Sequence, residues 1–235
     1  DLHAPMWAEI ADDDFMWQEE ENYVAGEFVW TGFDYLGEPT PYVNQTVKKM
    51  GYGDTAASRS SYFGVVDLVG IPKDRYYLYK SYWMPEEKTI HILPHWNWEE
   101  KEGENVPVFV YTNGDSAELL LNGISQGFER KIVDSEKSLE RYRLMWKEVV
   151  YQPGELKAVA YKNGEVLGEQ IVRTAGEIAE IRLKPDRTVI QPGIRDLSYI
   201  LIEAFDKDGN PVPLADNLVK FDVKGPGIIA GVGSG

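Results

Sequence analysis

The stretch SAELLLNGISQGFE, residues 116–129, decides the fold class, because two runs of strand-forming residues flank an Asn-Gly dipeptide. Asn122-Gly123 is typical of the two-residue turn of a β-hairpin, where both central residues need a positive φ. The later stretch ELKAVAYKNGEVLGEQIV, residues 155–172, repeats this pattern around Asn163-Gly164. Short strands at this spacing predict a β-sandwich domain over residues 88–173.

Turn signals continue on both sides of these two hairpins. Asn113-Gly114 is a third dipeptide of the same kind and predicts another hairpin turn. Apolar and polar residues alternate through 199–205 before Asp208-Gly209, which predicts a hairpin in the last part of the chain. This part, residues 176–235, falls short of the ~100 residues of a complete immunoglobulin-type sandwich. We therefore expect a truncated immunoglobulin-like domain there.

The first part of the chain, residues 1–84, mixes helical and strand patterns. Three aspartates at 12–14 precede an aromatic run and predict the start of a helix. Residues 27–33 are predicted to form a short strand. After Pro72, aromatic side chains recur at helical spacing through residues 73–83 and predict a second helix. The order helix, strand, loop, helix is α/β in character.

Composition excludes several classes of partner. The chain has 235 residues, 43% of them hydrophobic, which is enough to build real cores. Its 24 basic and 39 acidic side chains give a net charge of −15, which repels nucleic acid and anionic membrane surfaces. Cysteine is absent, and no run approaches the ~18 apolar residues of a membrane span. We predict neither nucleic acid nor membrane as a partner.

Three motifs resemble catalytic or metal sites, but their flanks argue against that chemistry. GISQG, residues 123–127, matches the G-x-S-x-G motif, yet Ser125 lies in a predicted strand with no helix after it. His91 and His95 lie in an extended run, which would hold their rings about 13 Å apart. Residues 206–217 lack the sixth-position glycine and final glutamate of a calcium loop. The sequence therefore predicts no metal site and no cofactor.

Trp96 and Trp98 alternate with Asn97, so they would share one side of a strand. Two alternatives follow from this alternation. The rings could form a platform on which sugars stack, or they could pack in the core or between domains, and we favour packing.

The stretch GEFVWTGFDYLGEPTPY, residues 26–42, contains the candidate binding site. Trp30 lies towards the end of the predicted strand, and the loop after it carries Asp34 and Glu38. If the strand belongs to a (β/α)₈ barrel, this loop lies on the face where such barrels hold their active sites. An indole can cover the apolar face of a pyranose while carboxylates bind its hydroxyls. A core tryptophan beside solvated loop acids is an equal alternative on these residues alone.

Three segments carry a resemblance to a known family: residues 25–42, residues 60–83 (SSYFGVVDLVGIPKDRYYLYKSYW) and residues 90–123 (IHILPHWNWEEKEGENVPVFVYTNGDSAELLLNG). They closely resemble the C-terminal half of glycoside hydrolase family 2 enzymes of the β-galactosidase type, in multidomain forms like those of Bacteroides. The resemblance implies a multidomain, mostly β chain: the C-terminal end of a (β/α)₈ barrel at 1–84, then the β-sandwich and the partial immunoglobulin-like domain.

Enzymes of this family are retaining hydrolases, which need two carboxyl groups about 5–5.5 Å apart. The family's two glutamates lie on the fourth and seventh barrel strands, and neither motif is present here. We therefore assign no catalytic residue, although Glu9, Glu27 and Glu38 are available carboxylates. The resemblance implies that the intact enzyme hydrolyses terminal β-linked sugars and that this chain alone is inactive. The alternative is a non-catalytic carbohydrate-binding or structural β module.

The resemblance also implies a substrate and a binding residue. Trp30 matches the tryptophan that lines the family's sugar pocket, and Asp34 and Glu38 follow it with a weaker match. Related β-glucuronidases have Asn-x-Lys before the glycine that corresponds to Gly64, whereas this chain has Ser61-Tyr62-Phe63. A neutral galactoside is therefore favoured, with β-glucuronidase or another family 2 specificity as the alternative. We expect a periplasmic or secreted bacterial protein whose signal segment lies outside this chain, and oligomerisation is compatible with it.

Overall fold

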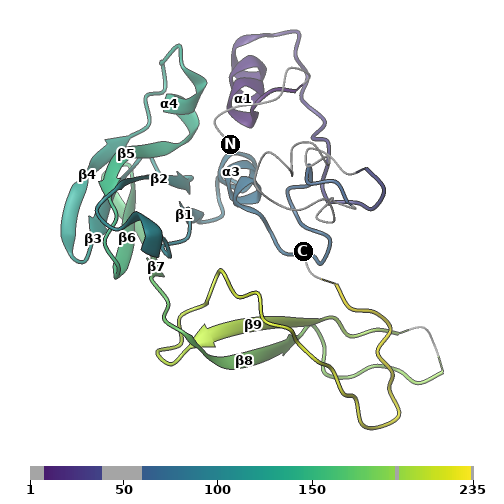
Figure 1. The fold of residues 1–235 in the computed structure, drawn as a ribbon. Coiled ribbons are helices and arrows are strands. Elements are labelled where there is room, and N and C mark those ends of the chain that lie inside the picture. The colour runs from purple at the N-terminus through teal and green to yellow at the C-terminus, as the bar shows by residue number, and fades with distance from the viewer. Residues whose placement is uncertain (1–7, 39–59, 194–195, 234–235) are drawn as a thin grey trace.

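The computed structural model describes residues 8–38, 60–193 and 196–233, which are mostly β with few helices (Figure 1). The helices are α1 (Ala11–Glu20), α3 (Asp74–Trp83), α4 (Ser138–Tyr142) and the short 3-10 helix η1 (Glu99–Lys101). The strands are β1 (Ile90–Leu93), β2 (Asn105–Thr112), β3 (Ser116–Leu121), β4 (Ile124–Arg130), β5 (Leu144–Val150), β6 (Glu155–Lys162), β7 (Glu165–Arg173), β8 (Ile178–Pro185) and β9 (Ile200–Asp206). None of the helices in these ranges combines the length and the apolar character that crossing a membrane requires.

Two antiparallel sheets share one core. One sheet has the strand order β1-β2-β5, and the other has the order β4-β3-β6-β7. Alternate side chains of β2, β3 and β6 point inward because successive residues of a strand face opposite sides. Val108, Leu119 and Ala158 are completely buried between the sheets, and Trp96 packs with them.

Two of the three predicted Asn-Gly turns are confirmed. Asn122 and Gly123 have φ values of 49° and 79°, and they join β3 to β4. Asn163 and Gly164, with φ values of 53° and 83°, join β6 to β7 in the same way. The local chemistry of the turn thus sets the register next to each turn, and an irregularity shifts it between Glu118 and Leu120 in one hairpin and between Ala160 and Tyr161 in the other.

The hairpin predicted at Asn113-Gly114 is wrong. Strands β2 and β3 on either side of it belong to different sheets, so the chain crosses from one sheet to the other here. The Asn113 side chain accepts a hydrogen bond from the Thr89 backbone N–H (2.9 Å) and donates one to the Pro85 carbonyl (2.7 Å). Asn113 therefore fixes the segment before β1 instead of forming a tight turn.

Both helices predicted in the first part of the chain are confirmed as α1 and α3. Asp12, Asp13 and Asp14 occupy the first turn of α1, where carboxylates complement the helix dipole. Phe15 of α1 is completely buried and stacks on Tyr82 of α3, with ring centroids 4.0 Å apart. The two helices thus share a second core.

The strand predicted at residues 27–33 is wrong. Within these residues, the described structure has only an isolated parallel bridge between Phe33 and Val66. An isolated antiparallel bridge between Leu36 and Ser60 follows after them. A ladder needs a neighbouring strand along its length, and no described strand lies beside residues 27–32. The peptide bond between Trp30 and Thr31 is cis.

Strands β8 and β9 form a separate two-stranded antiparallel sheet, drawn in green to yellow in Figure 1. The turn predicted at Asp208-Gly209 is confirmed, because Gly209 has a φ of 81° and an isolated bridge pairs Phe205 with Pro211 beyond it. Asp206 organises this turn by accepting hydrogen bonds from the backbone N–H groups of Asp208 (2.9 Å) and Asn210 (2.8 Å).

Candidate functional site

Trp30 presents an open indole at the surface. The residue is 73% exposed, and its Nε1 donates a hydrogen bond to the Tyr35 hydroxyl over 3.3 Å. The two rings lie edge to face, with centroids 6.2 Å apart and an interplanar angle of 84°. Tyr35 therefore orients the indole through both its ring and its hydroxyl group.

Tyr35 also connects the indole to a carboxylate. Its hydroxyl donates to Glu38 Oε2, and this hydrogen bond raises the pKa of Tyr35. Trp30, Tyr35 and Glu38 thus form one hydrogen-bonded chain on the surface, which combines a flat apolar ring with polar oxygen atoms. Tyr35 was not predicted as a site residue. Its position three residues before Glu38 in the same loop was the available signal.

Asp34, the third predicted site residue, lies beneath the loop and not at its surface. It is 8% exposed, and its Oδ1 accepts a hydrogen bond from the Gly64 backbone N–H (2.8 Å). Its Oδ2 forms an ion pair with Lys73 Nζ (2.6 Å). The structure therefore brings Trp30 and Glu38 together through Tyr35, while both carboxylate oxygens of Asp34 fix the loop to the segment that precedes α3.

Among the described residues, Lys73 places a cation beside this loop. Besides the ion pair with Asp34, its Nζ donates to the Tyr62 carbonyl (3.3 Å) and lies 5.7 Å from the centre of the Tyr62 ring. Ser61, at the first position of the Ser61-Tyr62-Phe63 stretch, is completely buried. The positive charge of Lys73 is thus balanced by Asp34 within the chain.

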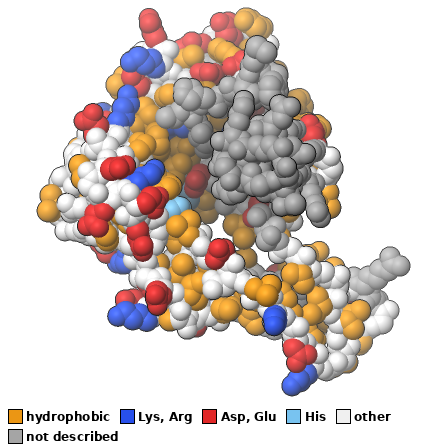
Figure 2. Space-filling model, viewed as in Figure 1, with side chains coloured by type: hydrophobic (Ala, Val, Ile, Leu, Met, Phe, Trp, Pro, Cys, Tyr) orange, Lys and Arg blue, Asp and Glu red, His pale blue; other side chains and the backbone are white. Residues whose placement is uncertain are grey.

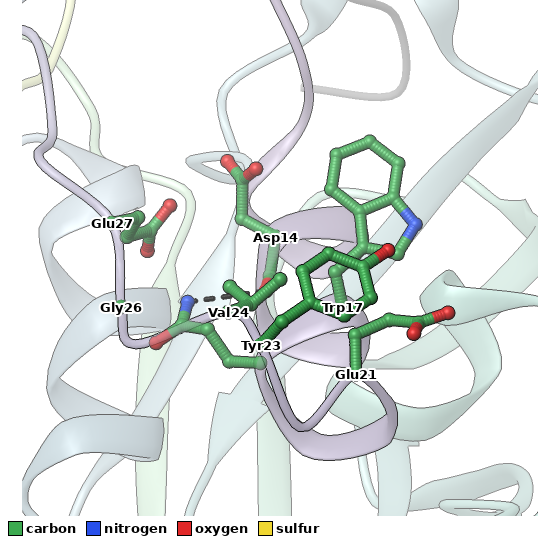
Figure 3. A pocket seen from close by; sticks show the side chains of 8 residues that line it. Asp14, Trp17, Glu21, Tyr23, Val24, Gly26 and Glu27 are labelled. Atoms are coloured by element: carbon green, nitrogen blue, oxygen red, sulfur yellow. Dashed lines mark hydrogen bonds between the residues drawn. The ribbon is translucent and has the colours of Figure 1, made fainter.

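A second group of polar side chains lies where the segment before Trp30 meets α1. A hollow of about 290 Å³ is lined by Asp14, Trp17, Gln18, Glu21, Tyr23, Val24, Gly26 and Glu27. In Figure 3, Asp14 lies between Glu27 on one side and the rings of Trp17 and Tyr23 on the other. Burial, a hydrogen bond with Asp14 and the Asp14 charge raise the pKa of Glu27 to about 8.

Trp96 and Trp98 pack in the protein interior, as we favoured. Trp96 is 1% exposed, and its Nε1 donates to the Gln152 carbonyl (3.0 Å). Trp98 is half-buried against the same core and donates to the His95 carbonyl (2.8 Å). Strand β1 ends at Leu93, so the strand alternation on which their shared side was predicted does not apply.

The other motifs have structural surroundings. His91 stacks on Tyr77 with ring centroids 3.8 Å apart and pairs with Asp74 (2.7 Å), whereas His95 stacks on Trp98. Ser125 lies within β4, and its hydroxyl donates to Glu118 (2.6 Å). Across the ranges that the structure describes, no three His, Cys, Asp or Glu side chains form a group that could hold a metal ion.

Comparison with known proteins identifies the family. Residues 181–235 match the profile of the glycoside hydrolase family 2 C-terminal domain 5, and residues 103–168 match a domain of unknown function, DUF4982. The chain is 42% identical to the β-galactosidase BoGH2A of Bacteroides ovatus over 99% of its length. The chain belongs to glycoside hydrolase family 2.

Further relatives extend this family 2 assignment. A putative β-glucuronidase of Formosa agariphila is 34% identical over 86% of the chain. A β-glycosidase structure from Bacteroides vulgatus superposes with a TM-score of 0.73 at 31% identity, over 88% of the chain and 24% of that structure. The chain spans 25% of BoGH2A and 18% of the Formosa relative. Its mostly β structure is consistent with the β domains of family 2 enzymes.

Proposed function

We propose that this chain is part of a retaining glycoside hydrolase of the β-galactosidase type, which hydrolyses terminal β-linked sugars when intact. The observation that carries the proposal is the open indole of Trp30, held by Tyr35 beside Glu38, in a chain 42% identical to a β-galactosidase. Trp30 supplies a wall on which the apolar face of the sugar stacks. Glu38 and the Tyr35 hydroxyl supply hydrogen bonds to the sugar's hydroxyl groups.

The proposal includes a division of the chain into three parts. Residues 1–84 form the C-terminal end of a (β/α)₈ barrel, which is supported by helices α1 and α3 on either side of the Trp30 segment. Residues 88–173 form a β-sandwich domain, supported by the two sheets around one core. Residues 176–235 form a truncated immunoglobulin-like domain, supported by the β8-β9 pair.

Asp34 has a different role from Trp30 in this proposal. Its carboxylate binds Gly64 and Lys73, so it holds the loop on which Tyr35 and Glu38 lie. A neutral galactoside is favoured over a uronic acid, because the Lys73 charge is already balanced by Asp34. The identity to a putative β-glucuronidase makes glucuronide hydrolysis the competing outcome.

A side-by-side assay tests the proposal. The full-length parent protein and the 235-residue chain are each incubated with chromogenic β-galactoside and β-glucuronide. We expect the parent to hydrolyse the galactoside, and we expect the chain alone to hydrolyse neither, because the two carboxyl groups of a retaining mechanism lie elsewhere in the parent. Turnover by the chain alone, or a parent that prefers the glucuronide, would contradict the corresponding part of the proposal.

The second candidate function assigns the β region a carbohydrate-binding or purely structural role. The burial of Trp96 in the sandwich core favours the structural role. Titration of the chain with galactan, followed by tryptophan fluorescence, distinguishes the two roles when the Trp30→Ala variant is the control. A response that survives in this variant would support binding by the β region, and a response that disappears would assign it to Trp30.

A further inference from the structure

We propose that Glu27 is a positioning residue that holds the Trp30 segment against helix α1 by sharing a proton with Asp14. The consequence for sugar binding rests on the proposed function, whereas the shared proton itself does not. Glu27 lies three residues before Trp30, and Asp14 lies within α1.

The Glu27 carboxyl group has an oxygen atom that receives no hydrogen bond within the described part of the chain. Glu27 Oε1 is buried, and it has no hydrogen-bond partner among the described residues. The Glu27 side chain shares its hollow with the Asp14 carboxylate and the Gln18 amide of α1. Two ionised carboxylates are both acceptors and cannot bond to each other, so a bond between Asp14 and Glu27 requires a proton on one of them. One shared proton joins the two carboxylates and satisfies the buried oxygen of Glu27.

Glu27 lies among polar and charged side chains of α1 and α3. On the α1 side it faces Asp14, Gln18 and, across the hollow, Glu21. On the α3 side it faces Tyr79 and Tyr82, and its negative charge contributes to the raised pKa of both phenols. Arg75 of α3 acts on Tyr79 and is not among the groups that shift Glu27. Burial and the Asp14 carboxylate favour the neutral, protonated form of Glu27, and the Gln18 amide opposes them with a smaller effect.

The Trp30 segment is attached to its neighbours differently before and after Trp30. After Trp30, the carbonyls of Thr31 and Gly32 accept hydrogen bonds from the backbone of Val65 and Val66, each over 3.1 Å. Before Trp30, residues 25–30 make no backbone hydrogen bond to the described residues. On that side the segment is held by the Glu27 side chain and by Val29, which packs against the second core. Ionisation of Glu27 beside Asp14 would therefore loosen the segment that leads into the indole.

Hydrogen exchange of the whole 235-residue chain tests the shared proton. The amides of Val65 and Val66 are the reporters, because they donate to the Thr31 and Gly32 carbonyls of the segment. After correction for intrinsic exchange rates, we expect their protection to fall by up to about tenfold per pH unit between about pH 5 and 8 and to level off above that range. The sign follows because the locally opened state ionises Glu27 at its ordinary pKa, whereas the closed state keeps the proton to a higher pH. Glu27→Gln keeps a neutral hydrogen-bonding group, so we expect its protection to lose this slope.

Two further variants make the result specific. Asp14→Asn should narrow the pH range of the slope, because it removes the carboxylate that shares the proton, while the burial of Glu27 still raises its pKa. Glu21→Gln is the matched control, because it removes a charge from the same hollow without touching the pair, and we expect it to keep the wild-type slope. A wild-type protection that is independent of pH, or a slope that persists in Glu27→Gln, would overturn the proposal.

The parent enzyme provides the link to sugar binding. We expect its KM for a β-galactoside to rise across the same pH range, and we expect Glu27→Gln to remove that part of the rise with little change in kcat at low pH. If KM shows no such rise while the exchange slope is present, the shared proton stands and its role in sugar binding is wrong. If the parent hydrolyses no galactoside at all, the proposed function fails while the exchange result still decides the shared proton.

Discussion

Gly64 lies against the backbone that carries the candidate site. A Cβ atom at this position would come within 2.2 Å of the Asp34 backbone nitrogen and 2.4 Å of the Phe33 carbonyl carbon. We therefore expect Gly64→Ala to destabilise the chain by about 1–3 kcal/mol, because the clash is with backbone that cannot turn aside. Chemical denaturation monitored by circular dichroism measures the change.

Gly176→Ala is the matched control for this substitution, because a Cβ atom there would meet no heavy atom within 4 Å. We expect its stability to remain within about 0.5 kcal/mol of the wild type. Equal effects at the two positions would show that the close approach of residues 33–34 to Gly64 does not constrain the loop.

At the scale of elements, an ion pair fixes α1 to the sandwich. Arg143 and Asp12 have side chains that are 2% and 0% exposed, and Arg143 Nε donates to Asp12 Oδ1 over 2.8 Å. We expect Arg143→Met to cost about 3–5 kcal/mol, because it leaves the buried Asp12 carboxylate without its cation. The double variant Asp12→Asn with Arg143→Met should cost less than the sum of the two single changes, as thermal unfolding can measure.

Arg173→Met is the control for that prediction, because Arg173 pairs with Glu155 at the surface, with side chains 46% and 36% exposed. Pairs of this kind contribute about 0–1 kcal/mol. If the Arg143 and Arg173 variants lose equal stability, or if the double variant is strictly additive, the buried pair does not anchor α1.

Elements whose signals are local could be predicted from sequence, and elements that depend on distant partners could not. The turns at Asn122-Gly123 and Asn163-Gly164 follow from the backbone preferences of their own residues. The prediction of a strand at 27–33 failed because a ladder requires a partner strand. The prediction of a hairpin turn at Asn113 failed because the Asn113 side chain holds a segment more than twenty residues upstream. Phe15 could be expected to be buried, but its packing partners on α3 and α4 could not.

The candidate site divides in the same way. One loop of sequence was enough to propose Trp30, Asp34 and Glu38 as site residues. The roles of Tyr35 and Lys73 could be described only from the folded geometry. The pairing of Asp14 with Glu27 depends on how α1 packs beside the Trp30 segment, and no spacing in the sequence indicates it.

At the scale of the whole molecule, the last part of the chain exposes an apolar sheet face. Ile181 and Leu183 of β8 are 53% and 64% exposed, and their cross-strand partners on β9 are Ala204 and Ile202. Figure 2 shows hydrophobic side chains spread over the lower part of the molecule, where Figure 1 places β8 and β9. An exposed patch of this kind favours association in solution.

We expect Leu183→Lys to reduce self-association of the chain at high concentration, because it adds a charge at the centre of that face. Light scattering as a function of protein concentration measures the effect. Lys184→Leu is the converse variant, since Lys184 lies on the opposite face of the same strand, and it should not reduce scattering. Unchanged scattering for Leu183→Lys would show that this face does not drive association.

The most direct test is the catalytic efficiency of the parent enzyme with Trp30→Ala, compared with Tyr199→Ala as a control at an exposed aromatic side chain outside the site. We expect Trp30→Ala to lower kcat/KM for a β-galactoside by about tenfold or more, the equivalent of about 1.4 kcal/mol of lost stacking, while Tyr199→Ala stays near the wild-type value. Equal kcat/KM for the wild type and Trp30→Ala would contradict the claim that this indole forms a wall of the sugar site.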